Sequence, residues 1–368
     1  MRLNLGFLSV LLVLPLLSIP VSAADFTARV ADGLGHPVGH ATVNVYWLKT
    51  VTEDDVREVS LLELVSDENG MVKGTYDETT VPSGETIWTE VSKEGYGGYS
   101  SNNLLPEYVL NREAGPADAR RIAMLDEKAQ IPELRELLAA DFEDSGDGLE
   151  TLVFAQEHRF RPALRALVTD AKIGMVAGQL LAFIGAPEDV RLVLEHAPPP
   201  APADSFENRW AYGVASALLE PSTEKEWAFL RSSALDEYDD AWVEAGAIQA
   251  LKLIASPKSL QILKEVRAAR RESAEQVEDA IQYIESAPPS LADEDLAAAG
   301  KKVAQAIRIG DWKGNKEPRF NEAGDKALVD CEFIAGRDLL VYTATFHKVE
   351  GRWKLRGVRE TMQAYLGE

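Results

Sequence analysis

The spacing of apolar residues changes character along the chain, and the first change defines an N-terminal region. From residue 25 to about residue 112, apolar and polar positions alternate in short runs separated by turns rich in Gly and Pro, which predicts antiparallel strands. Asn69-Gly70 separates two such runs, and both residues tolerate the positive φ that a tight hairpin connection requires. Short strands at this spacing, with no helical stretch among them, predict a β-sandwich over residues 24–112.

Helical spacing replaces the alternation between residues 125 and 290. Pro187, Pro221 and Pro257 each separate two runs of helical apolar spacing, at intervals of 34 and 36 residues, and weaker copies surround Pro162 and Pro288. Proline suits the first turn of a helix because the N–H groups there have no intrahelical partner. The pattern therefore predicts a repeated helix pair, with residues 113–124 as a linker before it.

A helix pair with one apolar face must bury that face against its neighbours, so repeats of this length stack into a solenoid. In the pair around Pro257, Leu251 is the centre of an apolar stripe that also contains Ala247 and Ile254. We expect Leu251 to be buried between helices.

The last region returns to strands. Residues 291–309 have helical spacing, and three alternating runs follow: "KALVDCEFIAG", "LLVYTATFHKV" and "RWKLRGVRETM", the last two joined at Glu350-Gly351. One helix followed by an antiparallel sheet predicts a small α+β domain over residues 291–368. Trp353, Leu355 and Gly357 are expected on one face of the last strand, with the basic residues of that strand on the opposite face looking outward.

Charge narrows the set of functions. The formal net charge is −22, and residues 291–368 contain equal numbers of acidic and basic side chains, so the acidic excess lies before residue 291. Such a surface repels nucleic acid and anionic lipid, which excludes nucleic-acid binding. The last hairpin is locally basic, and opposite fields predict that the C-terminal sheet docks on the helical region, where it would also cap the apolar stack.

The first residues predict export. Met1-Arg2 is followed by an almost wholly apolar run from Leu5 to Ile19 and by small residues at Val21-Ser22-Ala23, as in a secretory signal peptide over residues 1–23. The run is shorter than the roughly 20 residues that span a bilayer, so we expect no membrane insertion after cleavage and a periplasmic or extracellular location. Cys331 is the only cysteine, which precludes a disulfide within the chain.

Three segments resemble known families. "DGLGHPVGHATVNV", "DENG" and "KEGY" resemble the carboxypeptidase-regulatory-like (transthyretin-like) sandwich domains of exported proteins, which implies a structural or binding role. "FIGAPEDVRLVL" is similar to short HEAT-like repeats; the tetratricopeptide alternative needs Trp, Gly and Tyr positions that are missing here. "FHKVEGRWKLRGV" resembles the final hairpin of nuclear-transport-factor-like cone domains, whose curved sheet wraps a pocket, although a plain sheet capping the last helix pair explains these residues equally well.

Residue types that carry chemistry do not assemble into a known motif. His36 and His40 lie in a loop interrupted by Pro and Gly, so they do not share a helical face for a metal. Asp141–Leu152 has the acids and glycines of a calcium loop, but Leu152 stands where a bidentate glutamate is needed, and an acidic loop between helices is the expectation. We therefore assign no catalytic residue, no metal ligand and no cofactor.

One surface stands out as a candidate for partner binding, because rigid aromatic side chains occur there among carboxylates that can meet a basic partner. Its residues are Trp227, Asp236, Glu237, Tyr238, Asp239, Asp240 and Trp242. The alternative is that both tryptophans belong to the core and the acids to a solvated loop.

Two function classes remain. The first is an exported, non-catalytic binding or scaffold protein that presents sandwich and solenoid surfaces to a protein or glycan partner. The second is an enzyme of unknown reaction, possibly a hydrolase, with its site in a pocket of the C-terminal sheet. Nothing in the sequence points to an oligomeric state.

Overall fold

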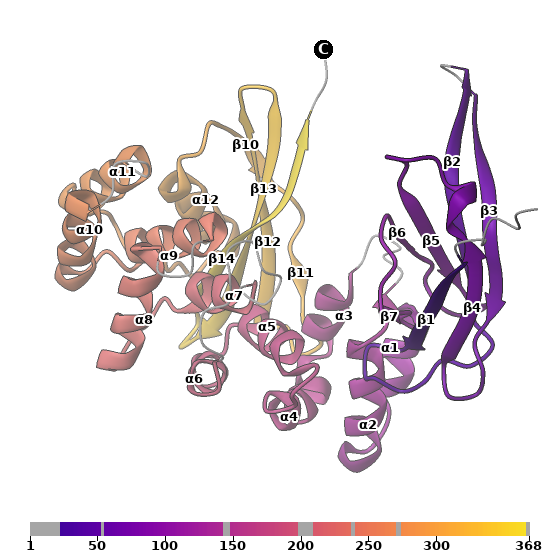
Figure 1. Ribbon diagram of the computed structural model, residues 1–368. Helices are drawn as coiled ribbons and strands as arrows, with labels where there is room; N and C mark the ends of the chain where they lie inside the picture. Colours follow the sequence, from indigo (N-terminus) through magenta and orange to yellow (C-terminus); the bar gives the residue numbers. More distant parts are fainter. Residues whose placement is uncertain are drawn as a thin grey trace, which may run out of the picture. The chain divides into compact units, whose positions relative to one another are not determined.

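The chain divides into two compact units, Met1–Asn111 and Arg112–Glu368, and each is described by itself. The computed structural model describes residues 23–52, 55–142, 148–197, 209–236, 240–269 and 274–365 (Figure 1). The predicted signal peptide, apart from Ala23, falls outside the described residues. None of the helices in the described part of the chain combines the length and apolar character needed to cross a bilayer.

The first unit is rich in strands, as predicted, and they form two sheets. A three-stranded sheet has the order β4-β1-β7, and a four-stranded sheet has the order β3-β2-β5-β6. Their bounds are β1 Ala23–Ala31, β2 Thr42–Thr52, β3 Asp55–Val65, β4 Met71–Asp77, β5 Ile87–Ser92, β6 Tyr99–Ser101 and β7 Glu107–Val109, with a 3₁₀ turn at Glu78–Thr80. Phe26 and Val30 of the first sheet and Val43 and Val45 of the second are buried in one shared core.

The connection at Asn69-Gly70 differs from the prediction. It joins β3 to β4, which belong to different sheets, so it is not a hairpin between paired strands. Asp67 organises this turn by accepting hydrogen bonds from the N–H groups of Asn69 at 2.8 Å and Met71 at 2.9 Å. Glycine is required at position 70 because φ is +74° and a Cβ would lie 2.2 Å from the carbonyl oxygen of Val30.

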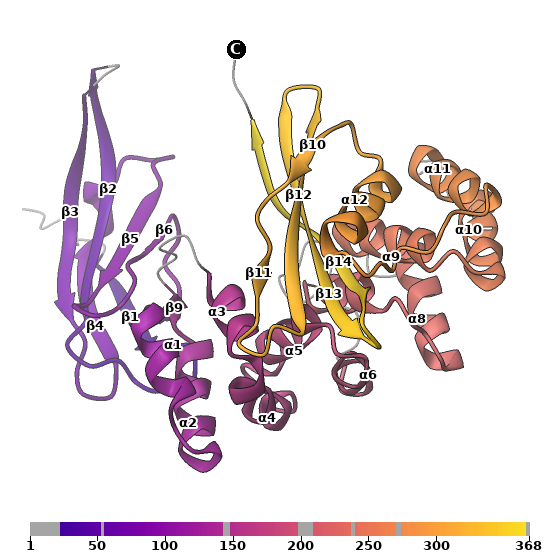
Figure 2. The same cartoon turned by 180° about the vertical axis from the view of Figure 1, so that it is seen from behind.

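The second unit begins with helices, and these stack in two rows. Helices α1, α3, α5, α7, α9 and α11 each contact the next member of their row, while α4, α6 and α8 lie on the side away from the C-terminal sheet (Figures 1 and 2). The bounds are α1 Pro116–Ala123, α2 Glu127–Leu138, α3 Leu149–Ala155, α4 Glu157–Leu167, α5 Gly174–Ile184, α6 Pro187–Glu195, α7 Arg209–Ala217, α8 Glu224–Ala234, α9 Ala241–Ile254, α10 Pro257–Ala269 and α11 Ala274–Glu285. Helix α1 occupies the stretch for which the sequence suggested a linker.

Most of the predicted helix breaks are confirmed. Helix α6 begins at Pro187 and α10 at Pro257, Pro221 lies in the connection between α7 and α8, and Leu251 is fully buried. The break expected at Pro162 is wrong, because this proline lies inside α4 and the chain turns earlier, at Gln156. Beyond its first turn, a helix tolerates one lost backbone hydrogen bond when its apolar face is packed, and that packing decides the boundary here.

Helices α4, α6, α8 and α10 form the outer row, and successive members of this row are joined by ion pairs. Arg161 of α4 lies 2.5 Å from a carboxylate oxygen of Asp189 of α6, and Arg191 of α6 lies 2.8 Å from Glu226 of α8. Arg231 of α8 continues the series to α10. Asp189 and Glu226 are buried, where an unpaired carboxylate would be strongly destabilising. These pairs fix the stacking of each helix pair on the next.

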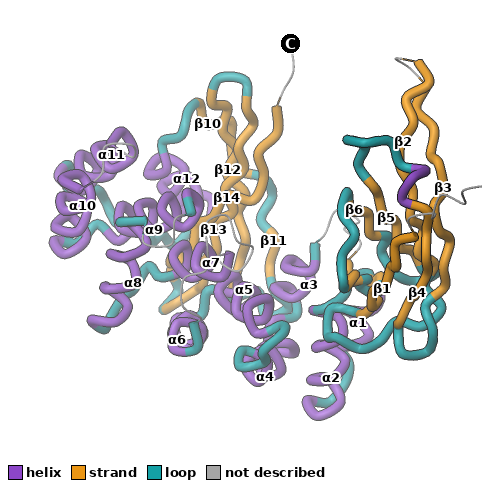
Figure 3. Tube along the Cα trace, viewed as in Figure 1, coloured by secondary structure: helices purple, strands orange, loops and turns teal. Residues whose placement is uncertain are grey.

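The C-terminal part forms one helix and a sheet, as predicted (Figure 3). Helix α12 is followed by an antiparallel sheet of order β10-β12-β13-β14, and a fifth strand, β11, pairs with β12. The bounds are α12 Leu296–Ile307, β10 Asp311–Asn315, β11 Arg319–Phe320, β12 Lys326–Ala335, β13 Asp338–Val349 and β14 Arg352–Tyr365; a two-stranded sheet pairs β8 Glu113–Ala114 with β9 Asp141–Phe142. The sequence analysis missed the short strands β10 and β11.

One face of the sheet packs on α12 and the other on the helical rows. Val303 and Ile307 of α12 share a core with Phe333 and Phe346. On the opposite face, Leu328 packs with Phe154 of α3 and Phe183 of α5. The sheet therefore docks on the helices, and it reaches as far back as α3 instead of closing only the last pair.

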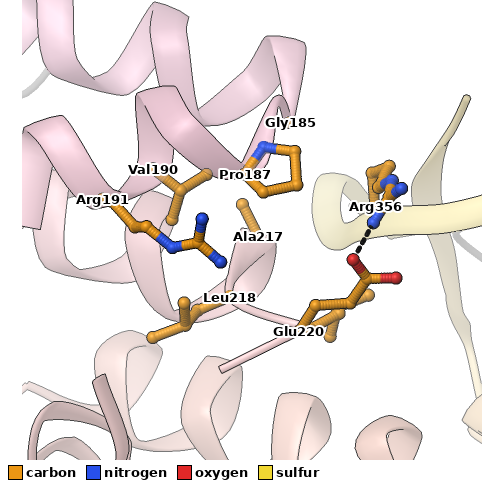
Figure 4. Close-up of a pocket in the computed structure, with 9 residues that line it drawn as sticks. Gly185, Pro187, Val190, Arg191, Ala217, Leu218, Glu220 and Arg356 are labelled. Carbon is orange, nitrogen blue, oxygen red and sulfur yellow. Dashed lines mark ion pairs between the residues drawn. The ribbon is translucent and has the colours of Figure 1, made fainter. Parts of the chain in front are cut away.

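Polar contacts reinforce this docking. Nε2 of His347 lies 2.7 Å from the carbonyl oxygen of Ile184, and Nζ of Lys326 lies 2.6 Å from a carboxylate oxygen of Glu157. Arg356 of β14 forms an ion pair with Glu220, in the connection between α7 and α8, and Figure 4 shows this pair beside a small recess next to Pro187. The basic face thus meets helices and does not look outward.

A register shift explains why simple alternation failed in β14. Leu355 is opposite Phe346, but Gly357 is opposite Thr345, so Arg356 is an extra residue on this strand. The bulge turns the following residues to the other face. Leu355 remains in the core with α12, whereas Gly357 lies against Ala217 of α7.

Candidate functional site

A large cavity of the second unit lies between the C-terminal sheet and the row of odd-numbered helices. Its volume is about 690 Å³, and its walls come from α7, α9 and α11, from the turn after α12, and from β13 and β14. Apolar wall residues include Trp242, Ala245, Ile248, Leu340 and Val358. We call this space the sheet–helix cavity.

Helix α9 supplies the longest wall of the sheet–helix cavity. Trp242, Ala245, Gln249 and Lys252 follow one another at intervals of three or four residues, so they share one helical face, and all four line the cavity. Of this face only Trp242 was predicted as a site residue, and the stripe predicted from the sequence is the opposite one, centred on Leu251. The signal that could have revealed the second stripe is the pair Gln249 and Lys252, two polar residues within an otherwise apolar helical run.

Lys252 is a buried cation with a complete set of partners. Its side chain is 3 % exposed, and Nζ donates hydrogen bonds to Oδ2 of Asp279 at 2.6 Å and to the carbonyl oxygen of Ile307 at 3.1 Å. Nζ also lies 5.5 Å from the centre of the Tyr283 ring. Burial lowers the pKa of Lys252, and Asp279 opposes this effect by stabilising the ammonium form.

Two tyrosines and a glutamate form a hydrogen-bonded chain on the sheet side. The hydroxyl of Tyr342 donates to Oε2 of Glu360 at 2.7 Å, and the backbone N–H of Glu360 donates to the hydroxyl of Tyr212 at 2.8 Å. Burial raises the pKa of Tyr212 to about 12, and burial together with the Glu360 carboxylate raises the pKa of Tyr342. Both side chains therefore remain neutral phenols at physiological pH.

A glycine lets α7 and α9 approach closely enough to hold Tyr212 in place. A Cβ at Gly246 would lie 2.8 Å from Cδ2 of the Tyr212 ring. Trp242, one turn earlier on α9, meets the same ring edge to face, with ring centres 6.2 Å apart and planes at 69°.

Trp242, Gln249 and Arg359 have binding capacity in the cavity that the described residues do not use; in Arg359 it is Nε, which has no hydrogen-bond partner among them. The side chain of Trp242 is 53 % exposed although it lines the cavity. Nε2 of Gln249 is buried and has no hydrogen-bond partner among the described residues. A buried donor without a partner costs free energy, which a bound acceptor would recover.

Of the remaining charged residues in the cavity wall, one is in an ion pair and two are exposed to solvent. Arg359 pairs with Glu150 and lies over the Phe183 ring, with its guanidinium carbon 3.9 Å from the ring centre. Arg308 ends α12 with a φ of 53° and is exposed, as is Glu275 of α11. The site therefore combines paired buried charges with solvated charges of both signs.

The predicted partner-binding residues separate in space. Trp227 lies on α8 beneath Lys258, whose Nζ is 5.2 Å from the ring centre, and it does not line the sheet–helix cavity, whereas Trp242 does. Asp240 caps α9 by accepting hydrogen bonds from two backbone N–H groups, and Oδ1 of Asp236 accepts one from the N–H of Asp240 at 2.9 Å. Glu237, Tyr238 and Asp239 lie outside the described residues.

The other groups considered from the sequence, Cys331 and the acidic segment Asp141–Leu152, do not form a reactive site in the described residues. Cys331 is buried in β12, and burial raises the pKa of its thiol to about 12, so the reactive thiolate is disfavoured. Of the Asp141–Leu152 segment, residues 143–147 lie outside the description and α3 begins at Leu149. Within the described residues of Arg112–Glu368, no three His, Cys, Asp or Glu side chains come together as a metal site would require.

No protein-family model matches the chain, and no curated protein or solved structure shows a significant match to it.

Proposed function

We propose that this chain is an exported, non-catalytic binding protein and that the sheet–helix cavity is its ligand site. The single observation that carries the proposal is the cavity of about 690 Å³, which lies within the range of roughly 300–1,000 Å³ typical of small-molecule sites. Its walls combine apolar side chains with polar and charged ones in similar number, so they can contact both the apolar surface and the polar groups of a ligand. Gln249 and Trp242 add an unused donor and an accessible ring.

The same proposal includes finer assignments for the three regions. The two sheets of the first unit, with their shared core, support a carboxypeptidase-regulatory-like sandwich. The serial contacts along the odd-numbered helices and the Ile184-Gly185 ending before Pro187 support a HEAT-like solenoid. A curved cone of the nuclear-transport-factor type is the corresponding proposal for the C-terminal sheet, because α12 covers one of its faces.

Surfaces outside the cavity have a separate proposed role. The sandwich and the outer helices would present extended areas to a protein or glycan partner in the periplasm or outside the cell. The apolar run after Met1-Arg2 supports export of the chain.

The ligand site is tested by filling it. A library of small metabolites is screened by thermal shift against the wild-type protein and against Ala245→Trp, which places an indole in the cavity. We expect compounds that raise the melting temperature of the wild type and leave that of Ala245→Trp unchanged. The variant must keep the wild-type circular dichroism spectrum. A screen without any stabilising compound, or compounds that stabilise both proteins equally, would contradict the proposal.

A second function is favoured by one observation. The carboxylate of Glu360 and the ammonium group of Lys252 line the same cavity, and burial lowers the pKa of Lys252. A carboxylate and an amine with a perturbed pKa in one cleft are typical of acid–base catalysis, so a hydrolase is the alternative. Turnover of any ester or glycoside substrate that is abolished by Glu360→Gln would establish it.

A further inference from the structure

We infer that the ligand of the sheet–helix cavity is neutral and rich in hydroxyl groups, as a short oligosaccharide is; this inference rests on the proposed function above. The buried charged side chains in the wall each already have a polar partner, although Nε of Arg359 has no hydrogen-bond partner among the described residues. Lys252 is paired with Asp279, Arg359 with Glu150, and the carboxylate of Glu360 accepts the hydroxyl hydrogen of Tyr342. A charged ligand group entering next to these side chains would leave water and meet groups that already have a partner, which offsets little of its desolvation cost.

Several polar side chains of the cavity wall remain available to form hydrogen bonds with a ligand. Gln249 offers a buried amide donor, and the exposed side chains of Glu275, Gln276 and Gln363 offer both acceptors and donors around it. A hydroxyl group can donate one hydrogen bond and accept two. Several hydroxyls on one ligand therefore match a mixed lining better than a ligand that only donates or only accepts.

The indole ring of Trp242 is accessible to a ligand in the cavity. Trp242 is held edge to face against Tyr212, which fixes its orientation while half of its side chain remains exposed. A rigid indole presents a large apolar face at low conformational entropy cost. The C–H face of a sugar ring fits such a surface, while its hydroxyls reach the polar residues of the same wall.

An anionic ligand is the main competitor, because Arg308 is an exposed cation at the cavity. Its charge is opposed by the exposed carboxylate of Glu275 in the same wall. The cavity wall as a whole carries three cationic and three anionic side chains: Lys252, Arg308, Arg359, Glu275, Asp279 and Glu360. The net charge of −22 on the chain further repels anions at long range.

The test uses the full-length protein on an array of neutral and acidic oligosaccharides, followed by calorimetric titration of the neutral oligosaccharide that gives the strongest signal. Three variants are compared with the wild type: Gln249→Met, Trp242→Ala and, as a matched tryptophan control outside the cavity, Trp227→Ala. We expect Gln249→Met and Trp242→Ala each to weaken binding roughly tenfold or more, and Trp227→Ala to leave it unchanged. Because Nε2 of Gln249 has no hydrogen-bond partner among the described residues, Gln249→Met should not lower the melting temperature without ligand.

The outcomes separate this inference from the proposed function. Binding of acidic sugars or apolar compounds alone, abolished by Ala245→Trp, would overturn the neutral-saccharide inference and leave the cavity as the site. Binding of a neutral sugar that neither Ala245→Trp nor Trp242→Ala affects would place the saccharide elsewhere and overturn both. Failure of every array sugar and every library compound to bind would also overturn both.

Discussion

Tyr342 and Glu360 stand directly opposite each other on β13 and β14, and the Tyr342 hydroxyl lies 2.7 Å from Oε2 of Glu360. This pair closes the sheet side of the cavity and, through the backbone N–H of Glu360, also fixes the Tyr212 hydroxyl on α7. The sheet and the helical row therefore share one hydrogen-bonded chain. A change at this pair should affect both walls of the cavity.

Removing the Tyr342 hydroxyl tests this link. Tyr342→Phe keeps the ring but leaves the Glu360 carboxylate without its donor, so we expect a loss of about 1–2 kcal/mol of stability. The measurement is the melting temperature by calorimetry, with Tyr365→Phe as the control because the Tyr365 side chain is exposed. Equal melting temperatures for Tyr342→Phe and the wild type would show that the hydrogen bond contributes nothing.

Gly246→Ala tests the close approach of α7 and α9. Alanine is the better helix former by about 1 kcal/mol, but its Cβ would lie 2.8 Å from the Tyr212 ring, which is tied to Glu360. We therefore expect a net loss of stability. Gly213→Ala on α7 is the matched control, since its nearest contact would be 3.7 Å and only the gain in helix propensity should remain. A variant at 246 that melts as high as the variant at 213 would rule out the steric argument.

The stacking of helices predicts a large effect at Leu251. This side chain is fully buried in α9, so Leu251→Ala should cost roughly 2–5 kcal/mol through lost burial and the cavity left behind. Denaturant unfolding measures the loss, and Met124→Ala serves as the control because that side chain is 70 % exposed. The same unfolding midpoint in Leu251→Ala and the wild type would contradict the packing described for α9.

His347 should make the docking of the sheet sensitive to acid. Burial lowers the pKa of His347 to about 4, with the cations Lys326 and Arg356 adding to the effect, whereas the unfolded chain titrates near pH 6.5. Below pH 6.5 the unfolded state binds a proton that the folded state does not. The contribution of neutral His347 to the free energy of unfolding is therefore fully present above pH 6.5. It falls by roughly 3 kcal/mol as the pH is lowered towards 4.

The variant His347→Gln can still donate a hydrogen bond to Ile184 but does not titrate. Its unfolding free energy should decline less steeply between pH 6.5 and 4 than that of the wild type. Parallel declines in the two proteins would mean that other groups carry the acid sensitivity.

Local pattern predicted much of the fold because strands and helices depend on neighbouring residues. The strands of the C-terminal sheet from Lys326 onward and the helix break before Pro257 followed from periodicity alone. The pairing of strands did not follow from periodicity. Asn69-Gly70 has the residues of a hairpin turn, yet the strands on its two sides belong to different sheets. Which strands pair is decided by packing of the whole core, which a local pattern does not contain.

Apart from Trp242, the residues of the candidate site were missed for a similar reason. Gln249 and Lys252 lie on α9, and the opposite wall comes from Tyr342 and Glu360, which are about ninety or more residues later in the chain. A polar residue in a helix usually indicates a solvated face. Only the docked sheet turns that face of α9 into the wall of a cavity.

The most direct measurement of the central claim is a crystal structure of the protein soaked with the oligosaccharide that binds most tightly. We expect ligand density inside the sheet–helix cavity, with a sugar ring against Trp242 and a hydroxyl within hydrogen-bond distance of Nε2 of Gln249. Density at full occupancy on any other surface, with this cavity filled only by solvent, would contradict it.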